Sequence, residues 1–474
     1  MLPLSRIPSW GLLSLSLAFT SAAAEVTLNR VFEFTGYENS SQNVGFVEGP
    51  DGNLYGWIGH AGQDRQSVVW RIGKDGTGFT VLHTFTGPSQ DAEDPTGLVY
   101  GSDGNLYGVA QDQQSLGRVF AMPADGSNYR VLKQFDLVTD KTAGPFGLVE
   151  ASDGRLYGVT GTGAPTGVVY GIGRDGTGFG ILHRFGQTRT DGQFPRGLLL
   201  ESKDGFLYGV TASDRTQFLG TVYRVGLNGG GYEILHQFKS DGLGAQPDSG
   251  LVLGSDGFLH GQASRGGPTG LGGLYKLRPD GSDYGFFETG TGGAQWYRSV
   301  CESGDGHLYG IQPGGSPLFN GTIFRTQLDG SGAEVLHTFP AAADSPEGVR
   351  PKQLLHARDG FLYCITHRKA AATIGTLTAF TPILMRFGPV ALPPTDPTES
   401  VTVIPRLVDN GSGQEFRLSV SGMPGRSYQV QVSPALPPSW ETVTTLTSDA
   451  EGKAEYADPN PSTAGSRYFR VLGP

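Results

Sequence analysis

Three cationic side chains recur at one position of a repeated phrase and have the chemistry to bind an anion. The position is the residue directly before the Gly, or its equivalent, of a Pro-x-Gly-Leu pattern. Arg196, Arg298 and Lys352 occupy it in a chain whose net charge is −10. If the three heads converge, they would bind carboxylates or sulfates of an acidic polysaccharide through charge-assisted hydrogen bonds. Through the copies of the phrase, the position holds Val44, Thr96, Phe146, Arg196, Ser249, Arg298 and Lys352.

Aromatic side chains near these cations would add flat surfaces for a ring-shaped ligand. Phe146 stands at the same position in another copy, and Trp296 and Tyr297 directly precede the second of the two arginines. Such faces, combined with a few polar groups, are typical of ligand pockets. The alternative interpretation is that the cations are solvated or paired with neighbours such as Asp248 and Glu347, because exposed ion pairs are common and weak.

The other candidates for metal or catalytic chemistry follow the repeat. Four histidines occupy one position of the repeat, namely His83, His183, His236 and His337. A shared position places them in different units around the fold, whereas a metal needs its ligands within about 2 to 2.6 Å. The Asp of each recurring Asp-Gly pair lacks calcium-loop spacing and is expected to accept backbone hydrogen bonds in its turn. The sequence contains no nucleophile elbow, P-loop or dinucleotide-binding glycine motif. We therefore expect no metal and no cofactor, and assign no catalytic residue.

The elements that must position these side chains are set by an internal repeat. The phrase Asp-Gly-x-Leu-Tyr-Gly, with small variations, occurs at intervals of about 50 residues. Its copies begin at Asp51, Asp103, Asp153, Asp204, Asp256, Asp305 and Asp359. Gly accounts for 75 of 474 residues and aromatics for 10%. This composition suits many short strands joined by tight turns.

Each unit contains four candidate strands. In the fourth unit they are 197–201, 206–211, 220–225 and 232–238, with Asp-Gly and Asn-Gly turns between them. These dipeptides supply the positive φ that short hairpins need. Four antiparallel strands per unit form one propeller blade, so seven units predict a seven-bladed β-propeller over residues 25–388. A helical solenoid is excluded because Gly and Asp-Gly interrupt every candidate 3.6-residue pattern.

The two ends of the repeat predict how the ring closes. The last unit has segments 375–380 and 383–387 without the usual turn between them, so it is one strand short. Residues 26–34 resemble the outer strand of the other units and precede the first full unit. Placing this N-terminal segment on the seventh blade would pair an exposed strand edge.

A different pattern follows the repeat. Residues 389–400 are rich in Pro and predict a linker. Beyond it, residues 401–474 contain alternating segments that predict strands, and a small domain built this way is most simply a β-sandwich. The segments are 416–421, 428–432, 440–446 and 468–471.

The start of the chain predicts export. Residues 1–24 combine Arg6, an apolar run and three alanines that end at Ala24, as in a cleavable signal peptide. We therefore expect a secreted, periplasmic or cell-surface protein without an integral membrane segment. The negative net charge argues against nucleic-acid binding. The two cysteines, Cys301 and Cys364, are expected to be separate buried thiols, although one disulfide is possible.

The repeated phrases resemble a known tandem repeat. Gly-Leu-Val-x-Gly-Ser-Asp-Gly-x-Leu-Tyr-Gly, followed by Gly-Thr-Val-Tyr-Arg and Val-Leu-His-x-Phe, is similar to the repeat named for Gloeobacter and Verrucomicrobia proteins, over roughly 26–388. The tail, with its Gly-Met-Pro-Gly at 422–425 and Tyr-Phe-Arg at 468–470, resembles the C-terminal domains of secreted verrucomicrobial proteins. The resemblance implies an exported propeller and transfers no catalytic residue.

These observations favour two functions. The first is an exported bacterial binding or interaction protein that holds a glycan or protein ligand at one face of the ring. The second is a carbohydrate-active enzyme, either a polysaccharide lyase or a glycosidase, with its site at the mouth of the central channel. Titratable groups that converge in one pocket would favour the enzyme, and scattered polar groups would favour binding.

Overall fold

The fold was obtained as a computed structural model. It describes residues 28–38, 43–61, 66–87, 94–112, 116–163, 166–188, 191–214, 219–247, 249–270, 272–288, 299–312, 321–340, 344–374, 377–388, 402–409, 414–421, 427–433, 441–447, 453–457 and 468–472. These residues form strands and turns. Within the described ranges, no helix has the length and apolar character needed to cross a bilayer.

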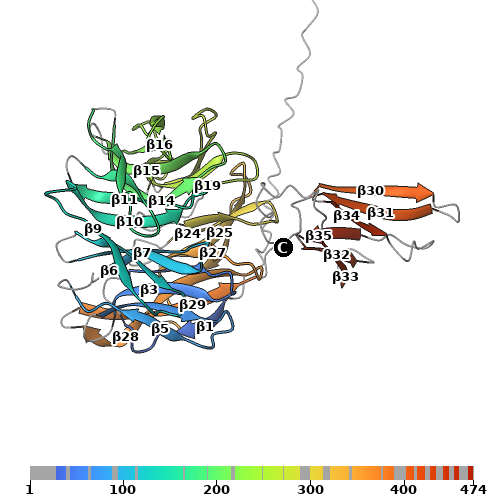
Figure 1. The fold of residues 1–474 in the computed structure, drawn as a ribbon, viewed down its shortest axis with the longest axis horizontal. Helices are drawn as coiled ribbons and strands as arrows, with labels where there is room; N and C mark the ends of the chain where they lie inside the picture. Colours follow the sequence, from blue (N-terminus) through green and yellow to red (C-terminus); the bar gives the residue numbers. More distant parts are fainter. Residues whose placement is uncertain are drawn as a thin grey trace, which may run out of the picture.

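Seven antiparallel sheets of the same topology follow one another along the chain (Figure 1). Blades one to four consist of β2 (Val44–Glu48), β3 (Leu54–Ala61), β4 (Gln66–Ile72), β5 (Thr80–Thr84), β6 (Asp94–Tyr100), β7 (Asn105–Gln111), β8 (Arg118–Pro123), β9 (Arg130–Gln134), β10 (Thr142–Glu150), β11 (Leu156–Gly163), β12 (Val168–Ile172), β13 (Gly180–Arg184), β14 (Gly192–Glu201), β15 (Phe206–Asp214), β16 (Thr221–Gly226) and β17 (Glu233–Gln237). Blades five to seven consist of β18 (Ala245–Pro247), β19 (Val252–Leu253), β20 (Leu259–Arg265), β21 (Gly273–Leu277), β22 (Gly285–Phe287), β23 (Ser299–Glu302), β24 (His307–Gln312), β25 (Thr322–Gln327), β26 (Glu334–Thr338), β27 (Leu354–His356), β28 (Leu362–Ile374), β29 (Leu377–Phe387) and β1 (Asn29–Glu33).

The seven-bladed propeller predicted from the repeat is confirmed. In the fourth unit, β14 to β17 coincide with the four predicted strands to within a few residues, except that β14 begins earlier. In the fifth blade the innermost strand is split into β18 and β19, which both pair with β20.

The recurring Asp-Gly phrase is stabilised by hydrogen bonds to its own Asp side chain. In the first unit, Asp51 Oδ1 accepts a hydrogen bond from the Asn53 amide at 3.1 Å, and Gly52 has a φ of 81°. Asp51 Oδ2 accepts a second bond from the Tyr55 hydroxyl at 2.8 Å. The second contact repeats in every unit that has Tyr, whereas in the fifth unit His260 takes the place of Tyr. The phrase is therefore a turn that also anchors its own buried aromatic side chain.

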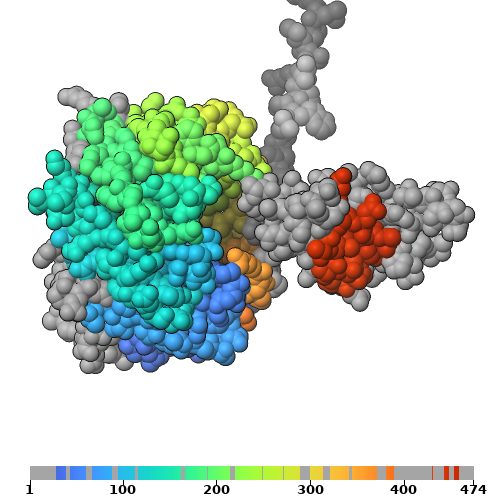
Figure 2. Space-filling view, viewed as in Figure 1, coloured from blue at the N-terminus to red at the C-terminus, as the bar shows by residue number. Residues whose placement is uncertain are grey.

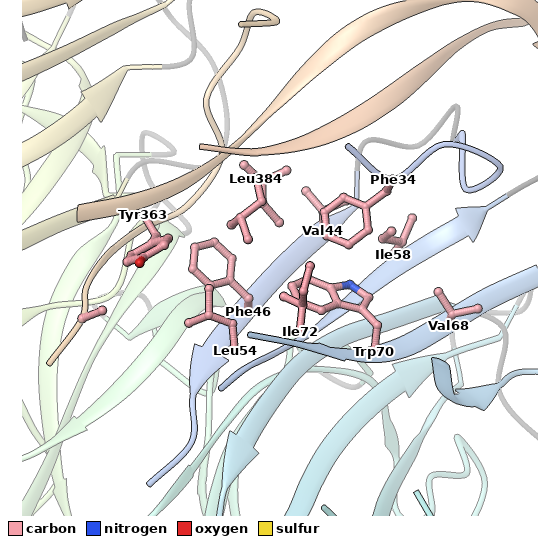
Figure 3. Packing of buried hydrophobic residues seen from close by; sticks show 12 residues of the cluster. Phe34, Val44, Phe46, Leu54, Ile58, Val68, Trp70, Ile72, Tyr363 and Leu384 are labelled. Carbon is pink, nitrogen blue, oxygen red and sulfur yellow. The ribbon is translucent and has the colours of Figure 1, made fainter. Parts of the chain in front are cut away.

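The hydrophobic core lies between the blades. Each of seven buried clusters combines residues from two consecutive blades, and one cluster joins the seventh blade to the first. Figure 3 shows this joining cluster, in which Phe34 and Leu384 of the seventh blade lie over Trp70 of the first. In Figure 2 the earliest blade, in blue, lies beside the orange surface of the last.

One packing pair recurs inside the blades. The Gly that ends the repeated phrase lies opposite a large aromatic residue on the next strand, and that ring occupies the space a Cβ would need. The seventh blade has a side chain instead of the Gly, and there the aromatic is replaced by Met. The pairs are Gly56–Trp70, Gly108–Phe120, Gly158–Tyr170, Gly209–Tyr223, Gly261–Tyr275, Gly310–Phe324 and Cys364–Met385.

The N-terminal strand closes the ring, as predicted. β1 pairs with β29, and the seventh sheet has the order β1-β29-β28-β27. Segments 375–380 and 383–387, predicted as separate pieces, belong largely to the single strand β29, which explains the missing turn. Phe34, one residue beyond β1, is fully buried, and its ring centroid lies 4.9 Å from that of Trp70.

The C-terminal segment forms two three-stranded sheets. One has the order β30-β31-β34 and the other β33-β32-β35. All four predicted segments are strands, and two further strands were not predicted. The packing of the two sheets into a sandwich stays a prediction, and the predicted linker 389–400 and the predicted signal peptide lie outside the described residues. The bounds are β30 (Thr402–Asp409), β31 (Gln414–Ser421), β32 (Ser427–Ser433), β33 (Glu441–Thr447), β34 (Lys453–Ala457) and β35 (Tyr468–Leu472).

Both cysteines are free thiols. Cys364 is buried on β28, and Cys301 on β23 packs against the same cluster between blades six and seven. Burial raises the pKa of each thiol to about 12, because the thiolate would lose its hydration. Both cysteines therefore act as small apolar side chains.

Candidate functional site

A cavity of about 580 Å³ lies where the innermost strands of all seven blades meet. Its walls come from residues on, or directly before, the inner strand of each blade, together with Trp57 from β3. Because every blade contributes, the cavity is the central channel of the propeller. The lining residues are Asn43, Val44, Val47, Trp57, Thr96, Gly97, Leu98, Phe146, Gly147, Arg196, Gly197, Leu198, Ser249, Gly250, Leu251, Val252, Ser299, Val300, Lys352 and Gln353.

Glycine in the Pro-x-Gly-Leu pattern allows neighbouring inner strands to approach. Gly197 has a φ of 68°, and a Cβ on it would lie 2.5 Å from the Gly250 nitrogen of the next blade. A Cβ on Gly147 would lie 2.7 Å from Leu198. The chain therefore needs Gly where strands converge on the axis, and the residue directly before it reaches the cavity.

In the seventh blade, Gln353 takes the place of this Gly and joins the inner ring. Its Oε1 accepts a hydrogen bond from the Phe46 amide at 2.9 Å, and its Nε2 donates to the Phe46 carbonyl at 2.8 Å. This two-point contact ties the last inner strand to β2 of the first blade. Side-chain hydrogen bonds thus join the inner strands of the last and first blades at the channel wall.

The structure brings together every described member of the predicted position. Val44, Thr96, Phe146, Arg196, Ser249 and Lys352 all line the cavity. Arg298, Trp296 and Tyr297 lie outside the described residues, as does Asp248. The other suggested partner, Glu347, has its carboxylate 3.1 Å from His337 Nε2.

The cavity is cationic where it is described. Arg196 Cζ lies 5.5 Å from the centre of the Phe146 ring, a cation–π distance. Burial, together with the nearby charge of Arg350, lowers the pKa of Lys352 to about 8. No Asp or Glu is among the described lining residues. The titratable groups among the described lining residues are therefore cations, in a chain whose net charge is −10.

Trp57 is a lining residue that the sequence reasoning missed. It stands on β3, directly after the Gly of the repeated phrase, and its Nε1 donates to Asn43 Oδ1 at 3.3 Å. The same position holds Val109, Val159 and Val210 in the next three units. An alignment of the units would have shown Trp57 as a large aromatic residue at a position where these units have Val.

Leu198 is a second missed lining residue, and it remains 50% exposed although the repeat places Leu in the core elsewhere. Its counterpart Leu148 in the third blade is buried. The channel thereby presents apolar surface to a ligand.

The recurring histidines serve the junctions between blades. His83 stacks on Tyr129 of the next blade with ring centroids 3.9 Å apart, and His183 stacks on Tyr232 at 3.4 Å. His236 stacks on the corresponding tyrosine of the fifth blade. Groups of three or more metal-ligating side chains do not occur among the described residues.

The fold and the cavity define a seven-bladed propeller with a cationic axial channel. A model of the Gloeobacter/Verrucomicrobia repeat matches residues 15–199 and 110–289, which together exceed half of the chain. The protein belongs to this repeat family, as its phrases indicated. None of the curated proteins matches the sequence significantly.

Solved structures with a similar outline are distant in sequence. One, described as the extracellular domain of a hybrid two-component system of B. thetaiotaomicron, is 12% identical with a TM-score of 0.48, and the match covers 84% of this chain and 46% of that one. This chain thus spans less than half the length of that protein. A protein of unknown function from Dyadobacter fermentans is 10% identical with a TM-score of 0.43, and the match covers 77% of this chain and 99% of that one.

Proposed function

We propose that this protein is an exported bacterial binding protein that holds the end of an acidic glycan in its central channel. The observation that carries the proposal is the axial cavity, whose wall combines Arg196 and Lys352 with the aromatic side chains of Phe146 and Trp57. Two partly buried cations attract an anionic group more strongly than fully exposed cations do.

The aromatic and apolar lining supports a sugar ligand over a small inorganic anion. Phe146 and Trp57 both line the cavity, and carbohydrate rings pack their C–H faces on such flat side chains. Thr96, Ser249 and Ser299 supply small polar groups around the same wall. A volume of about 580 Å³ lies within the usual range for small-molecule pockets.

The double variant Arg196→Ala/Lys352→Ala tests the proposal. We expect it to keep its fold but to bind polygalacturonate at least about 100-fold more weakly, because each of the two charge-assisted hydrogen bonds contributes about 1.5–3 kcal/mol. The measurement is isothermal titration calorimetry at two salt concentrations, and the wild-type affinity should fall with salt. Arg278→Ala is the matched control, because Arg278 is a half-exposed cation outside the cavity that pairs with Asp283. Equal affinity of the wild type and the double variant would contradict the proposal.

Binding should also weaken as the pH rises through 8. Lys352 is charged below its pKa of about 8 and neutral above it, while uronate carboxylates stay ionised throughout this range. The wild-type affinity for polygalacturonate should therefore decline from about pH 7 to about pH 9, in titrations at constant ionic strength. The variant Lys352→Arg should bind equally over this range, because guanidinium remains charged. A flat wild-type profile would show that Lys352 does not contact the anion.

A second candidate function, polysaccharide lyase, is favoured by the same lysine. Amines with a pKa near neutrality act as general bases. Lys352 would remove the C5 proton of a uronate while Arg196 neutralises its carboxylate, and the electron pair would form the C4–C5 double bond as the C4 oxygen leaves. Ultraviolet absorbance of an unsaturated product after incubation with polygalacturonate, lost in Lys352→Ala, would establish this activity. If polygalacturonate binds but no unsaturated product forms, the protein is a binding protein and not a lyase for this polymer.

A further inference from the structure

The inner strand of the fourth blade contains one residue more than the inner strands of the other blades. In every other unit, the Asp of the turn follows the Gly of the Pro-x-Gly-Leu pattern, or its equivalent, by six positions, as Asp153 follows Gly147. In the fourth unit, Asp204 follows Gly197 by seven positions. The strand pairing contains the same excess. At the bulge, four steps on β14 face two on β15, whereas two steps on β10 face one on β11.

Leu198 is the extra residue, because the next residue takes the place that follows the Gly directly in other blades. In the fifth blade, the Leu directly after the Gly of the pattern covers the Gly of the repeated phrase: Leu251 Cδ2 is 3.0 Å from the position of a Cβ on Gly261. In the fourth blade, the second residue after the Gly does this, and Leu199 Cδ2 lies at the same distance from a Cβ on Gly209. The core position is therefore filled by Leu199, and Leu198 is additional to it.

The extra side chain lies in the wall of the channel. Leu198 is 50% exposed and lines the cavity, whereas the other described lining residues are buried or half-buried. A Cβ on Gly250 of the fifth blade would lie 3.0 Å from the Leu198 carbonyl oxygen, and a Cβ on Gly147 of the third blade would lie 2.7 Å from its Cδ2. Glycines of both neighbouring blades thus leave room for Leu198, and its exposed apolar surface belongs to the cavity.

We propose that Leu198 is a specificity-determining residue, which selects anionic sugars that carry an apolar substituent, such as a methyl ether, next to the charged group. The inference rests on the proposed function and deepens it by naming the class of ligand. Arg196 and Leu198 are two residues apart on β14, so their Cα atoms lie within about 7 Å of each other and one sugar unit can contact both. The guanidinium would bind the carboxylate, and the Leu side chain would remove the substituent from water.

Two sugars that differ by one methyl group test the inference. They are glucuronate and 4-O-methylglucuronate, in which the ether stands on the carbon next to the one that bears the carboxylate. We expect the wild type to bind the methyl ether about fourfold more tightly, as burial of one methyl-sized group predicts. Leu198→Ala should bind the two sugars with equal affinity in isothermal titration calorimetry. The matched control is Leu243→Ala, because Leu243 is 52% exposed and lies outside the cavity; it should keep the fourfold preference.

Deletion of Leu198 separates specificity from folding. The deletion restores the spacing of the other six units, so we expect a melting temperature close to that of the wild type and the same loss of preference as in Leu198→Ala. A sharply lower melting temperature in both variants would assign Leu198 to the fold and overturn the inference.

Two binding results would also overturn the inference. One is equal wild-type affinity for the two sugars, and the other is a preference for the methyl ether that survives in both Leu198 variants. If Arg196→Ala/Lys352→Ala still loses its affinity for polygalacturonate, the proposed function stands without the inference. A wild-type protein that binds neither glucuronate nor polygalacturonate would remove the proposed function and the inference together.

Discussion

Deleting residues 25–35 should lower the melting temperature sharply and cause the protein to aggregate. The deletion removes β1, which is the outermost strand of the seventh blade and the only part of that blade contributed by the N-terminal end of the described chain. β29 would become an open edge, and unpaired edges recruit other chains. The deletion also removes Phe34 from the cluster that joins the last blade to the first.

The size of the effect follows from burial. Truncation of one fully buried Phe typically costs about 3–5 kcal/mol, and a whole domain is usually stable by only about 5–15 kcal/mol. Phe34 is fully buried, and Phe32 packs with its ring 5.0 Å from that of Phe79. Thermal denaturation with light scattering measures both outcomes. Arg30→Ala is the control, because its half-exposed ion pair with Glu33 contributes about 1 kcal/mol or less. An unchanged melting temperature of the deletion would show that the ring is closed without β1.

Gly56→Ala should destabilise the first blade strongly. A Cβ at this position would overlap the ring of Trp70 and the carbonyl oxygen of Gly45, and Trp70 is fully buried. Overpacking of this kind usually costs about 1–3 kcal/mol, and the backbone contact prevents relief by a rotamer change alone. Urea denaturation measures the loss. The matched control is Cys364→Ala, because the corresponding position of the seventh blade already accommodates a side chain opposite Met385.

A double-mutant cycle tests the physical cause. Trp70→Met reproduces the partner found in the seventh blade and removes the ring from the space above Gly56. The double variant should therefore lose less stability than the sum of the single variants, by about 0.5–3 kcal/mol of coupling. Strict additivity would mean that the Trp70 ring is not what excludes the methyl group.

Much of the fold was predictable because its information is local. The Asp-Gly turns, the alternating strands and the period of about 50 residues are contained in short stretches of chain, so seven blades follow from counting. Closure by the N-terminal strand was also predictable, since one unit lacked a strand and the start of the chain supplied one. Hydrogen bonds from Tyr55 and its counterparts to the turn Asp were not predicted, because the sequence indicated only that the Asp accepts backbone hydrogen bonds within its turn.

The candidate site was predictable in part. Periodicity alone placed Phe146, Arg196 and Lys352 at one position of the repeat, and the structure brings them to one cavity. Trp57 comes from the neighbouring strand β3, where its ring occupies the space that a Cβ on Gly45 of β2 would need, a contact that the repeat does not reveal. The negative net charge gave no indication of these cations, because net charge does not say where individual charges lie, and only their shared position in the repeat pointed to the channel.

The sequence by itself determined the repeat, the all-β class, the number of blades and the strand that closes the ring, because these depend on turn chemistry and strand count within each unit. Only the tertiary structure decided which side chains share the channel, that burial beside Arg350 lowers the pKa of Lys352, and that Phe194 and Arg350 adopt left-handed φ. The shared channel arises from contacts between residues in different blades, up to about 300 residues apart in the chain, as between Phe46 and Gln353. Such contacts depend on ring closure, which brings the first and last blades together in space.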